Sequence, residues 1–507
     1  MSISKIIPLD ELAGRSLALK AEGKRVVLCH GAFDLMHAGH IRHMQRAKQE
    51  GDVLMVTVTG DAYVNKGPGR PVFSEHLRAE YVAALACTDF VAISHAVTAT
   101  VALSRIQPDV YAKGSDYRSP EDDVTGNIVS EQEAVEAHGG RIFYTDEITF
   151  SSSHLLNEHF GVFPPETKAY LGAFRANWSD KDIHRMLQSL SGLRVLVIGD
   201  AIVDQYHYTA PLGQTGKYNI LAVRYESEEQ FAGGAIAAAN HLGGFSSQVT
   251  LVTGLGTINS HEEFIRSKLS KNVEPVFFYM EGAPTVTKRR FVDGDLAKLF
   301  EVYFYHTDPM PDETEQRICA WLHQHVEEYD VVVVPDFGNG FITSVMVDEI
   351  CDRAKYLAVN TQVNSGNRGF HVIHRYTRAD FVSLNEPEVR LASHNRQDPI
   401  ESVARDVSER VKARNFAVTR GTKGVIMLDR QSGVAHTVPA LSTKVVDRIG
   451  AGDAFLSLSG LCLGGGLPSE VAAFVGSAAA ALDVQIVCNR EPISAVSLNK
   501  YVTTLLK

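Results

Sequence analysis

Short runs of β-branched and other apolar residues alternate with amphipathic stretches between residues 24 and 147. The runs have the length and continuity of strands buried on both faces, and the stretches between them carry apolar positions at helical spacing. Alternation of this kind predicts a parallel, doubly wound α/β sheet. The predicted strands are Val26–Leu28, Val53–Val58, Phe90–Ile93, Val110–Ala112 and Arg141–Tyr144, and the predicted helices lie around 40–50, 75–86, 98–106 and 130–138.

A second α/β series begins at Arg194 and predicts a second, independent sheet. Between the two series, Pro164-Pro165 is followed by apolar residues at helical spacing (Ile183, Leu187), so we expect a short helical linker. The expected domains are 1–160, a linker at 161–190, and 191–507, both domains being doubly wound parallel-sheet α/β folds. The strands predicted for the second sheet are Arg194–Asp200, Val249–Val252, Val331–Pro335, Tyr356–Asn360, Phe381–Asn385, Phe416–Thr419 and Val425–Leu428.

Composition narrows the class of protein. The chain has 507 residues, 45% hydrophobic and 21% charged, which is typical of a soluble globular enzyme with two or three domains. Its net charge of −11 argues against a nucleic-acid partner. Six scattered cysteines without metal-ligand spacing predict neither a zinc site nor a disulfide framework. With neither a signal-peptide core nor an apolar run long enough for a membrane span, we expect a cytoplasmic protein.

A segment rich in glycine and histidine follows the first predicted strand. It runs from Gly31 to His40 and opens the helix predicted around 40–50. The unpaired N–H groups at a helix amino terminus attract phosphate. His37 and His40 are three residues apart, so both rings point to one side and can donate hydrogen bonds to phosphate oxygens. The alternatives are a helix cap with incidental histidines and a metal-binding pair.

A second glycine-rich segment, Gly450-Ala451-Gly452-Asp453, lies far downstream. Its small residues allow a backbone nest that holds a transferring phosphoryl group, and a carboxylate there can take the proton of an attacking hydroxyl. Taken alone, the segment is equally compatible with a structural turn. Together the two segments predict that the chain handles phosphate at two sites.

The first segment resembles the HxGH nucleotidyltransferase superfamily. Lys113-Gly114-Ser115-Asp116-Tyr117 is similar to that family's KGxDY segment, and the likeness covers nearly all of 24–160. It implies that the histidines bind a nucleoside triphosphate, that a lysine and an arginine neutralise its phosphates, and that a hydroxyl triplet holds the nucleotide. The residues expected in these roles are His37, His40 and Lys113 in catalysis, and Phe33, Asp34, Gly39, Arg78, Ser151, Ser152 and Ser153 in nucleotide or phosphate binding.

The second segment, with Val418–Gly424, Asn385–Glu388 and Gly199–Asp204 before it, is similar to the ribokinase-like (phosphofructokinase B) sugar kinases from about 192 to 507. The likeness implies a catalytic base, an anion hole, residues near Mg²⁺ and phosphate, residues beside ATP, and residues on the sugar. The residues expected in these five roles are, in order, Asp453; Gly450, Ala451 and Gly452; Asn385 and Glu388; Thr419, Gly421 and Gly424; and Asp204, Gly233 and Gly234. Lys288–Arg290 either meet a substrate phosphate or form an exposed strand edge, and Gly254–Gly256 are expected in a turn.

The pairing of the two modules resembles the bifunctional heptose kinase/nucleotidyltransferases of ADP-heptose synthesis, in which the kinase comes first; here the order is reversed. In that family the kinase phosphorylates the anomeric hydroxyl of a heptose 7-phosphate, a separate phosphatase removes the 7-phosphate, and the second domain adenylylates the 1-phosphate, for lipopolysaccharide. The resemblance implies ATP as the nucleotide, with CTP as a rival in the transfer step, Mg²⁺ at both sites, a sugar phosphate substrate, and a homodimer formed through the kinase domain.

Two departures from the sugar-kinase pattern leave alternatives open. Ala237 stands where those kinases usually carry an asparagine that holds substrate hydroxyls, with Asn240 a turn later. Asn360-Thr361-Gln362 replaces the Asp-Pro-Lys of the heptose kinases. Losing one hydrogen bond to a substrate hydroxyl costs about 1–3 kcal/mol, enough to change specificity. The alternatives are a non-catalytic sensor or dimerisation domain beside an active nucleotidyltransferase, and a CTP-dependent enzyme acting on another sugar or a polyol phosphate.

Overall fold

The computed structural model of the chain describes residues 5–64, 70–96, 98–114, 127–145 and 163–507. Its contacts divide the chain into two compact units, residues 1–164 with 499–507, and residues 165–498. Among the described residues, none of the helices combines the length and the apolar character needed to cross a bilayer.

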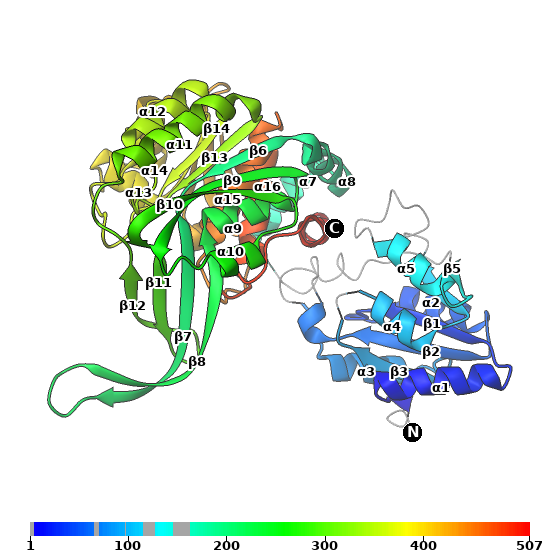
Figure 1. Cartoon of the computed structure of the whole chain (residues 1–507). Helices are drawn as coiled ribbons and strands as arrows, with labels where there is room; N and C mark the ends of the chain where they lie inside the picture. The colour runs from blue at the N-terminus through cyan, green and yellow to red at the C-terminus, as the bar shows by residue number, and fades with distance from the viewer. Residues whose placement is uncertain (1–4, 65–69, 97, 115–126, 146–162) are drawn as a thin grey trace. The chain divides into compact units, whose positions relative to one another are not determined.

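The first unit is built on a five-stranded parallel sheet in the order β3-β2-β1-β4-β5 (Figure 1). All five strands predicted from the apolar runs are confirmed. Two apolar clusters cover the two faces of the sheet, which explains why its strands are continuously hydrophobic. The elements are α1 (Leu9–Ala21), β1 (Val26–Gly31), α2 (Ala38–Lys48), β2 (Val53–Thr59), α3 (Glu75–Ala83), β3 (Phe90–Ser94), α4 (Thr100–Ile106), β4 (Val110–Gly114), α5 (Asn127–Glu136) and β5 (Arg141–Thr145).

The second unit contains a nine-stranded sheet in the order β10-β9-β6-β13-β14-β15-β16-β17-β18. The seven strands predicted for it are confirmed, but the sheet is not wholly parallel, because β17 pairs antiparallel with both of its neighbours. The strands are β6 (Arg194–Ile198), β9 (Gln248–Ile258), β10 (Val273–Pro284), β13 (Val331–Asp336), β14 (Leu357–Thr361), β15 (Phe381–Asn385), β16 (Asn415–Thr419), β17 (Val425–Asp429) and β18 (Ala435–Val438).

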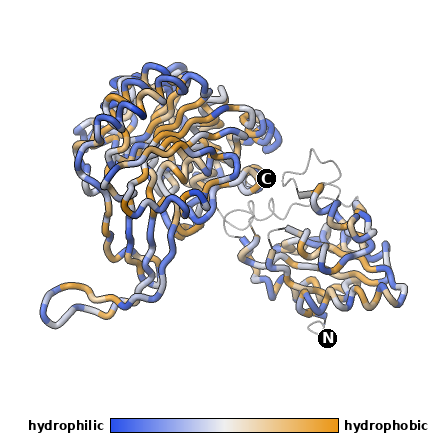
Figure 2. The backbone as a smooth tube through the Cα atoms, in the orientation of Figure 1, coloured by the Kyte–Doolittle hydropathy of each residue, from blue (hydrophilic) through white to orange (hydrophobic). Residues whose placement is uncertain are grey.

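Helices cover both faces of this sheet, and the apolar residues concentrate between them (Figures 1 and 2). Helices α11, α12 and α14 pack on one face, and α9, α15 and α16 pack on the other. The helices from 165 onward are α7 (Pro165–Asn177), α8 (Asp180–Ser189), α9 (Ala235–Gly243), α10 (Glu262–Lys268), α11 (Asp312–His325), α12 (Ser344–Arg353), α13 (Glu386–Ser393), α14 (Ile400–Arg410), α15 (Ala451–Gly464), α16 (Ser469–Asp483) and α17 (Ala495–Leu506).

A separate four-stranded sheet, in the order β12-β11-β7-β8, adds a third sheet to the two that the sequence predicted. Two of its strands extend into a long hairpin arm that projects from the second unit (Figure 1). The outer parts of both strands are exposed rather than buried, so the arm lacks the continuous buried run that marks the other predicted strands. The strands are β7 (Ala201–Gln214), β8 (Leu221–Gly234), β11 (Thr287–Val292) and β12 (Lys298–Phe304).

Gly254 and Gly256 lie inside strand β9, so their assignment to a turn was wrong. A β-carbon on Gly256 would come within 2.2 Å of the carbonyl oxygen of Ala283. The residue is therefore a glycine because the backbone of β10 passes directly against it.

The segment expected to link the two domains forms α7 and α8, and both helices belong to the second compact unit. The Phe174 ring from α7 stacks on Phe474 from α16, with centroids 4.3 Å apart. The Trp178 indole N–H donates to Glu470 Oε2 over 3.0 Å. These contacts hold the segment against α16, one of the helices that cover the sheet.

Candidate active sites

Helix α2 of the first unit begins at the two predicted histidines. His37 is the residue that caps the helix, and its Nδ1 accepts a hydrogen bond from the Gly39 N–H over 3.1 Å. The rings of His37 and His40 stack with their centroids 3.9 Å apart, and burial lowers the pKa of His37. His37 caps the helix, as the helix-cap alternative predicted. Both rings also lie on one side of the helix start, as the phosphate-site prediction expected.

Phe33 and Asp34 shape the turn that leads into this helix. Phe33 has a positive φ of 50°, and its ring packs edge-on against His40 with centroids 5.6 Å apart. The Asp34 carboxylate accepts the Val72 N–H over 2.7 Å and the Phe73 N–H over 3.2 Å. Asp34 therefore fastens the loop before α3 to the turn before α2.

Arg78 is placed differently from the sequence prediction. Its side chain is completely buried, and its guanidinium donates to the carbonyl oxygens of Ala32 and Phe73 and to Asp61 Oδ1. A guanidinium that neutralises a phosphate has to face open space, so the assignment of Arg78 to phosphate binding is corrected. It holds the backbone at Ala32, just before the histidine-bearing turn, in place.

Lys113 is the penultimate residue of strand β4 and forms a buried ion pair with Glu131 of α5, which also accepts a hydrogen bond from Tyr111. The predicted lysine is thus held by a carboxylate close to the carboxyl edge of the sheet. Ser115 to Tyr117 of the KGxDY-like segment and the triplet Ser151, Ser152 and Ser153 lie outside the described residues.

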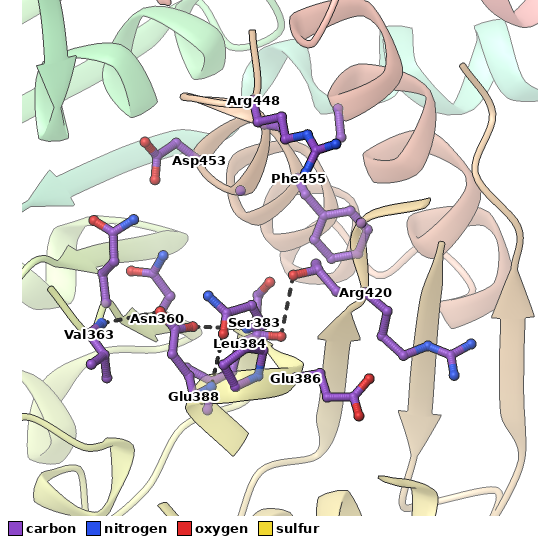
Figure 3. Close-up of a pocket in the computed structure, with 18 of the residues that line it drawn as sticks. Asn360, Val363, Ser383, Leu384, Glu386, Glu388, Arg420, Arg448, Asp453 and Phe455 are labelled. Atoms are coloured by element: carbon purple, nitrogen blue, oxygen red, sulfur yellow. Dashed lines mark hydrogen bonds between the residues drawn. The ribbon is translucent and has the colours of Figure 1, made fainter. Parts of the chain in front are cut away.

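A large cavity in the second unit brings together residues from the nine-stranded sheet, the four-stranded sheet and the start of α15 (Figure 3). Segments more than 200 residues apart in sequence meet there. Of the residues predicted for this site, all but Gly233 line the cavity: Asp204, Gly234, Asn385, Glu388, Thr419, Gly421, Gly424, Gly450, Ala451, Gly452 and Asp453.

Asp453 lies in the first turn of α15, immediately after the glycine-rich segment. Gly450 caps that helix with a φ of 101°, a left-handed conformation that favours glycine, and its carbonyl accepts the Asp453 N–H over 2.8 Å. A β-carbon on Gly452 would meet no atom within 4 Å, so the cavity reaches the helix end there. Burial, and then Asp204, raise the pKa of Asp453 to about 7, while Lys288 opposes the shift.

Asp204 stands on β7 and forms a buried ion pair with Arg290 of the neighbouring strand β11. Arg290 also contacts Glu301 Oε1 over 3.1 Å. Strand β11 lies between β12 and β7, and Lys288 and Arg290 are buried, so the exposed-edge alternative for this basic run is wrong. Both cations line the cavity, and burial lowers the pKa of Lys288.

Gly233 and Gly234 lie at the end of β8, opposite the strand that carries Asp204. A β-carbon on Gly233 would come within 2.2 Å of Asp204 Oδ2, and one on Gly234 within 2.4 Å of the Asp200 carbonyl oxygen. The pair is therefore required for close packing around Asp204, and only Gly234 reaches the cavity.

Asn385 and Glu388 form a reciprocal capping box at the start of α13. Glu388 Oε2 accepts the Asn385 N–H over 2.9 Å, and its Oε1 accepts the Val363 N–H over 3.1 Å (Figure 3). Burial raises the pKa of Glu388 to about 7. A buried carboxyl group that lines this cavity fits a hydrated Mg²⁺, which keeps several of its waters and relieves the cost of burying negative charge.

The loop after β16 closes another side of the cavity. Thr419 ends the strand, and Gly421 and Gly424 both have positive φ. A β-carbon on Gly424 would meet the Val438 carbonyl oxygen at 2.0 Å, which fixes glycine there. Gly421 has open space at the corresponding point, where a ligand can approach its backbone.

The two departures from the kinase pattern have structural counterparts. Ala237 is buried in α9, and Asn240 is engaged with backbone, donating to the Lys268 carbonyl and accepting the Ser270 N–H. Asn240 therefore does not replace the missing amide. Asn360 does face the cavity (Figure 3), and its Oδ1 has no hydrogen-bond partner among the described residues.

Several residues that shape this site were not predicted. Asp447 accepts the Tyr206 hydroxyl over 2.6 Å and contacts the Lys298 ammonium at 3.3 Å, which ties the approach to α15 to the four-stranded sheet. Arg448 lines the cavity, and its guanidinium makes no hydrogen bond or ion pair with the described residues. The only sequence signal was their position just before Gly450.

Two family models match the chain in the predicted order. The pfkB family carbohydrate kinase model matches residues 193–493, and the cytidylyltransferase-like model matches residues 28–157. The first range contains the cavity residues around Asp453, and the second contains the stacked histidines.

Curated relatives cover parts of the chain. The bifunctional protein HldE of Geotalea uraniireducens is 43% identical over 143 residues, which are 28% of this chain and 28% of that protein. The protein of the same name from Trichlorobacter lovleyi is 27% identical over 333 residues, 63% of this chain and 66% of that protein. The chain thus spans less than two thirds of the length of either relative.

A solved structure matches the second unit. The crystal structure of phosphofructokinase-2 from Escherichia coli with substrates and products has a TM-score of 0.50 and 16% sequence identity, covering 62% of this chain and all of that one. At this identity the likeness shows the fold, a ribokinase-like α/β sheet.

Proposed function

The chain belongs to the pfkB family of carbohydrate kinases, and on that basis we propose that its second unit transfers the γ-phosphoryl group of ATP to a sugar hydroxyl. One observation carries the proposal: Asp453, with a pKa near neutrality, opens α15 beside a glycine-rich turn that faces the cavity. A carboxylate placed there can accept the hydroxyl proton while the helix N–H groups receive the phosphoryl group.

In this reaction the sugar oxygen attacks the γ-phosphorus, and the bond from that phosphorus to the β,γ-bridging oxygen breaks. The hydroxyl proton passes to Asp453, and ADP leaves. Asp204, held by Arg290, accepts a hydrogen bond from another sugar hydroxyl. Lys288 is buried in the cavity wall, where the charges of Asp204 and Asp453 act on it. Its positive charge lowers the cost of the negative charge that gathers there.

Glu388 and Asn385 would hold Mg²⁺ through its water molecules, and the ion would supply charge neutralisation for the triphosphate. Thr419, Gly421 and Gly424 line the cavity, and we assign them to the nucleotide. The backbone at Gly421 is open to a ligand, whereas Gly424 shapes the loop.

For the first unit we propose nucleotidyl transfer. A sugar 1-phosphate oxygen attacks the α-phosphorus of ATP, the bond to the pyrophosphate leaving group breaks, and a nucleotide sugar forms. The stacked rings of His37 and His40 at the start of α2 support this role, since imidazole and helix N–H groups can stabilise a pentacoordinate phosphorus. CTP is the rival donor.

The sugar we propose is a heptose 7-phosphate phosphorylated at its anomeric hydroxyl, with the 7-phosphate removed by a separate phosphatase before nucleotidyl transfer. The relatives named bifunctional protein HldE support it, and the product would be an ADP-heptose for lipopolysaccharide. The buried cation Lys288 in the cavity wall fits a substrate that carries its own phosphate.

A second candidate keeps the nucleotidyltransferase and makes the kinase-like unit a sensor or dimerisation domain. Ala237 and the engaged side chain of Asn240 favour it, because no amide replaces the one usually found on the sugar. A third candidate keeps both reactions but uses CTP and another sugar or polyol phosphate.

We also propose a homodimer through the four-stranded sheet. One face of that sheet carries a row of stacked rings, His207 on Phe291 at 5.0 Å and Phe291 on Phe300 at 4.4 Å. Phe300 and Phe304 are exposed on the outermost strand. An exposed aromatic surface of this kind is typical of an interface between subunits.

The deciding experiment incubates the full chain with a mixed pool of sugar phosphates, ATP, CTP and Mg²⁺, and identifies the products by mass spectrometry. A sugar bisphosphate with equivalent ADP, followed by an ADP-sugar once a phosphatase is added, supports the proposal. ATP binding without turnover on any sugar would favour the sensor, and a CDP-linked product would favour the third candidate.

A further inference from the structure

Behind the Gly450 turn lies a group of buried polar atoms that the proposed reaction does not use. Asp483, the last residue of α16, is fully buried, and neither carboxyl oxygen has a hydrogen-bond partner among the described residues. The same holds for Nε2 of His241 in α9 and for Oδ1 of Asn489. Burying a carboxyl group without a hydrogen-bond partner costs free energy, so this arrangement calls for an explanation.

These atoms lie directly against the turn that carries the proposed anion hole. A β-carbon on Gly450 would come within 2.7 Å of Asp483 Oδ2 and within 2.3 Å of Asn489 Oδ1. The residue after Asp483 binds the same segment, because the Val484 carbonyl accepts the Val446 N–H over 2.7 Å. The end of α16 therefore supports the backbone that leads into α15.

The hydrogen-bonding pattern of His241 fixes which nitrogen bears hydrogen. Its Nδ1 accepts the Ile493 N–H over 3.1 Å, so Nδ1 offers a lone pair and the neutral ring carries its hydrogen on Nε2. That Nε2 stands 4.0 Å from Asp483 Oδ1, just beyond hydrogen-bonding distance. Burial lowers the pKa of His241 to about 4, in agreement with a neutral ring.

The groups around Asp483 favour its neutral form over the ionised carboxylate. Asp483 Oδ2 and Asn489 Oδ1 both lie against the Gly450 turn, and neither has a hydrogen-bond partner among the described residues, so an ionised carboxylate would add charge to a group of acceptors. A neutral acid supplies an O–H donor to this group of acceptors, and its Oδ1 faces the His241 Nε2–H at 4.0 Å. Burial, followed by the acidic neighbours Asp453 and Asp447, raises the pKa of Asp483 well above its ordinary value.

We propose that Asp483, in its protonated form, and His241 are positioning residues of the phosphoryl-transfer site, which hold the Gly450 turn in the conformation that receives the transferred group. This inference rests on the proposed kinase function. The groups that face Asp483 are His241 from α9, Asp447 and Asp453 from the segment around Gly450, and the amide of Asn489.

The test compares Asp483→Asn, which is neutral at every pH and retains a donor and an acceptor, with Asp483→Leu, which retains neither. We expect the first variant to keep kcat within about twofold, and the second to lose kcat about tenfold or more with a smaller change in the KM for sugar, because a displaced turn harms the transition state most. Active sites are counted by nucleotide binding. Phe474→Leu, in the same helix but packed on Phe174, is the control and should lower thermal stability without changing kcat per active site.

A second measurement does not depend on activity. If Asp483 is protonated in the folded state, the unfolding temperature of Asp483→Asn minus that of the parent should increase from pH 5 to pH 8. The reason is that only the parent must retain a proton that its unfolded state releases. A pH-independent difference, or a tenfold loss of kcat in Asp483→Asn, would overturn the proposal. A parent that forms no ADP with any sugar would contradict the kinase function, while the stability comparison would still decide the state of Asp483.

Discussion

Arg290 on β11 and Asp204 on β7 form an ion pair in which both side chains are buried in the wall of the cavity. The pair orients a carboxylate at the place expected to meet the sugar. Because a buried charge without its partner is strongly destabilising, the pair should matter for folding as well as for binding.

We therefore expect Arg290→Met to lower the free energy of unfolding of the second unit by about 3–5 kcal/mol, since Asp204 is left buried and uncompensated. Denaturant unfolding measures it. The surface pair Arg266 and Glu262 supplies the control, because Arg266→Met should cost less than about 0.5 kcal/mol. Equal losses in the two variants would mean that Asp204 is not charged or not buried.

Asp453→Asn should remove sugar-dependent ADP formation by about 10²–10⁴-fold, since the general base is lost. Release of pyrophosphate from a supplied sugar 1-phosphate should stay at the parent rate. Coupled assays for ADP and pyrophosphate follow the two reactions separately. An undiminished kinase rate would exclude Asp453 as the base.

His40→Ala should abolish pyrophosphate release, by at least about 10²-fold, because a donor to the transition-state phosphate is lost. The kinase reaction should be unaffected. Simultaneous loss of both activities, with the fold intact by circular dichroism, would show that the two reactions do not use separate sites.

The kinase reaction should show an acid limb in log(kcat/KM) near pH 7. Asp453 must be ionised to accept a proton, and its pKa is raised to about 7, so activity should fall as the pH drops below that value. The free energy of unfolding should depend on pH in the opposite direction to the activity. A carboxyl group whose folded pKa is raised stabilises the fold at pH values below its unfolded pKa and loses that contribution as the pH rises toward 7.

Glu388, whose pKa is also raised to about 7, adds to the same stability trend. Asp453→Asn should therefore flatten the dependence of the unfolding temperature on pH between 4 and 7 only in part. A limb near pH 4 in the kinase profile would contradict a base with a raised pKa.

Gly450→Ala and Gly452→Ala should behave differently although they are two residues apart. At Gly450 the positive φ and the close Asn489 and Asp483 oxygens leave no room for a methyl group, so we expect a loss of stability of about 1–3 kcal/mol together with loss of kinase activity. At Gly452 the methyl group enters open cavity, so stability should be kept while the kinase rate falls. Thermal unfolding and initial rates separate the two effects.

The sequence predicted the strands that are buried on both faces, because runs such as Val331–Val334 have no polar alternation to confuse with a helix. The four-stranded sheet escaped prediction because the outer parts of β7 and β8 are exposed in the long arm, so these strands do not form continuous buried runs. Arg78 shows the same limit at the level of one side chain. The family resemblance implied a phosphate ligand, whereas its contacts include the Ala32 carbonyl, which is 46 residues away in sequence.

Most of the candidate site in the second unit was predicted from the resemblance to the sugar kinases, and its motifs meet because strand ends lie at one edge of a parallel sheet. The supporting residues were not. Asp483 lies in an alanine-rich helix with no motif around it, and only the fold brings it to Gly450. Residues that act through a neighbouring backbone leave no periodic trace in a sequence.

The stacking of Phe174 on Phe474 has a practical consequence for dissecting this enzyme. A fragment that starts near residue 191, just before the first strand of the nine-stranded sheet, would lack α7 and α8. The Phe474 ring of α16 would then lose its partner Phe174 and become exposed to solvent. The same helix ends at Asp483, beside the Gly450 turn. A better start for the kinase fragment lies before Pro165, because α7 and α8 then remain with the second unit.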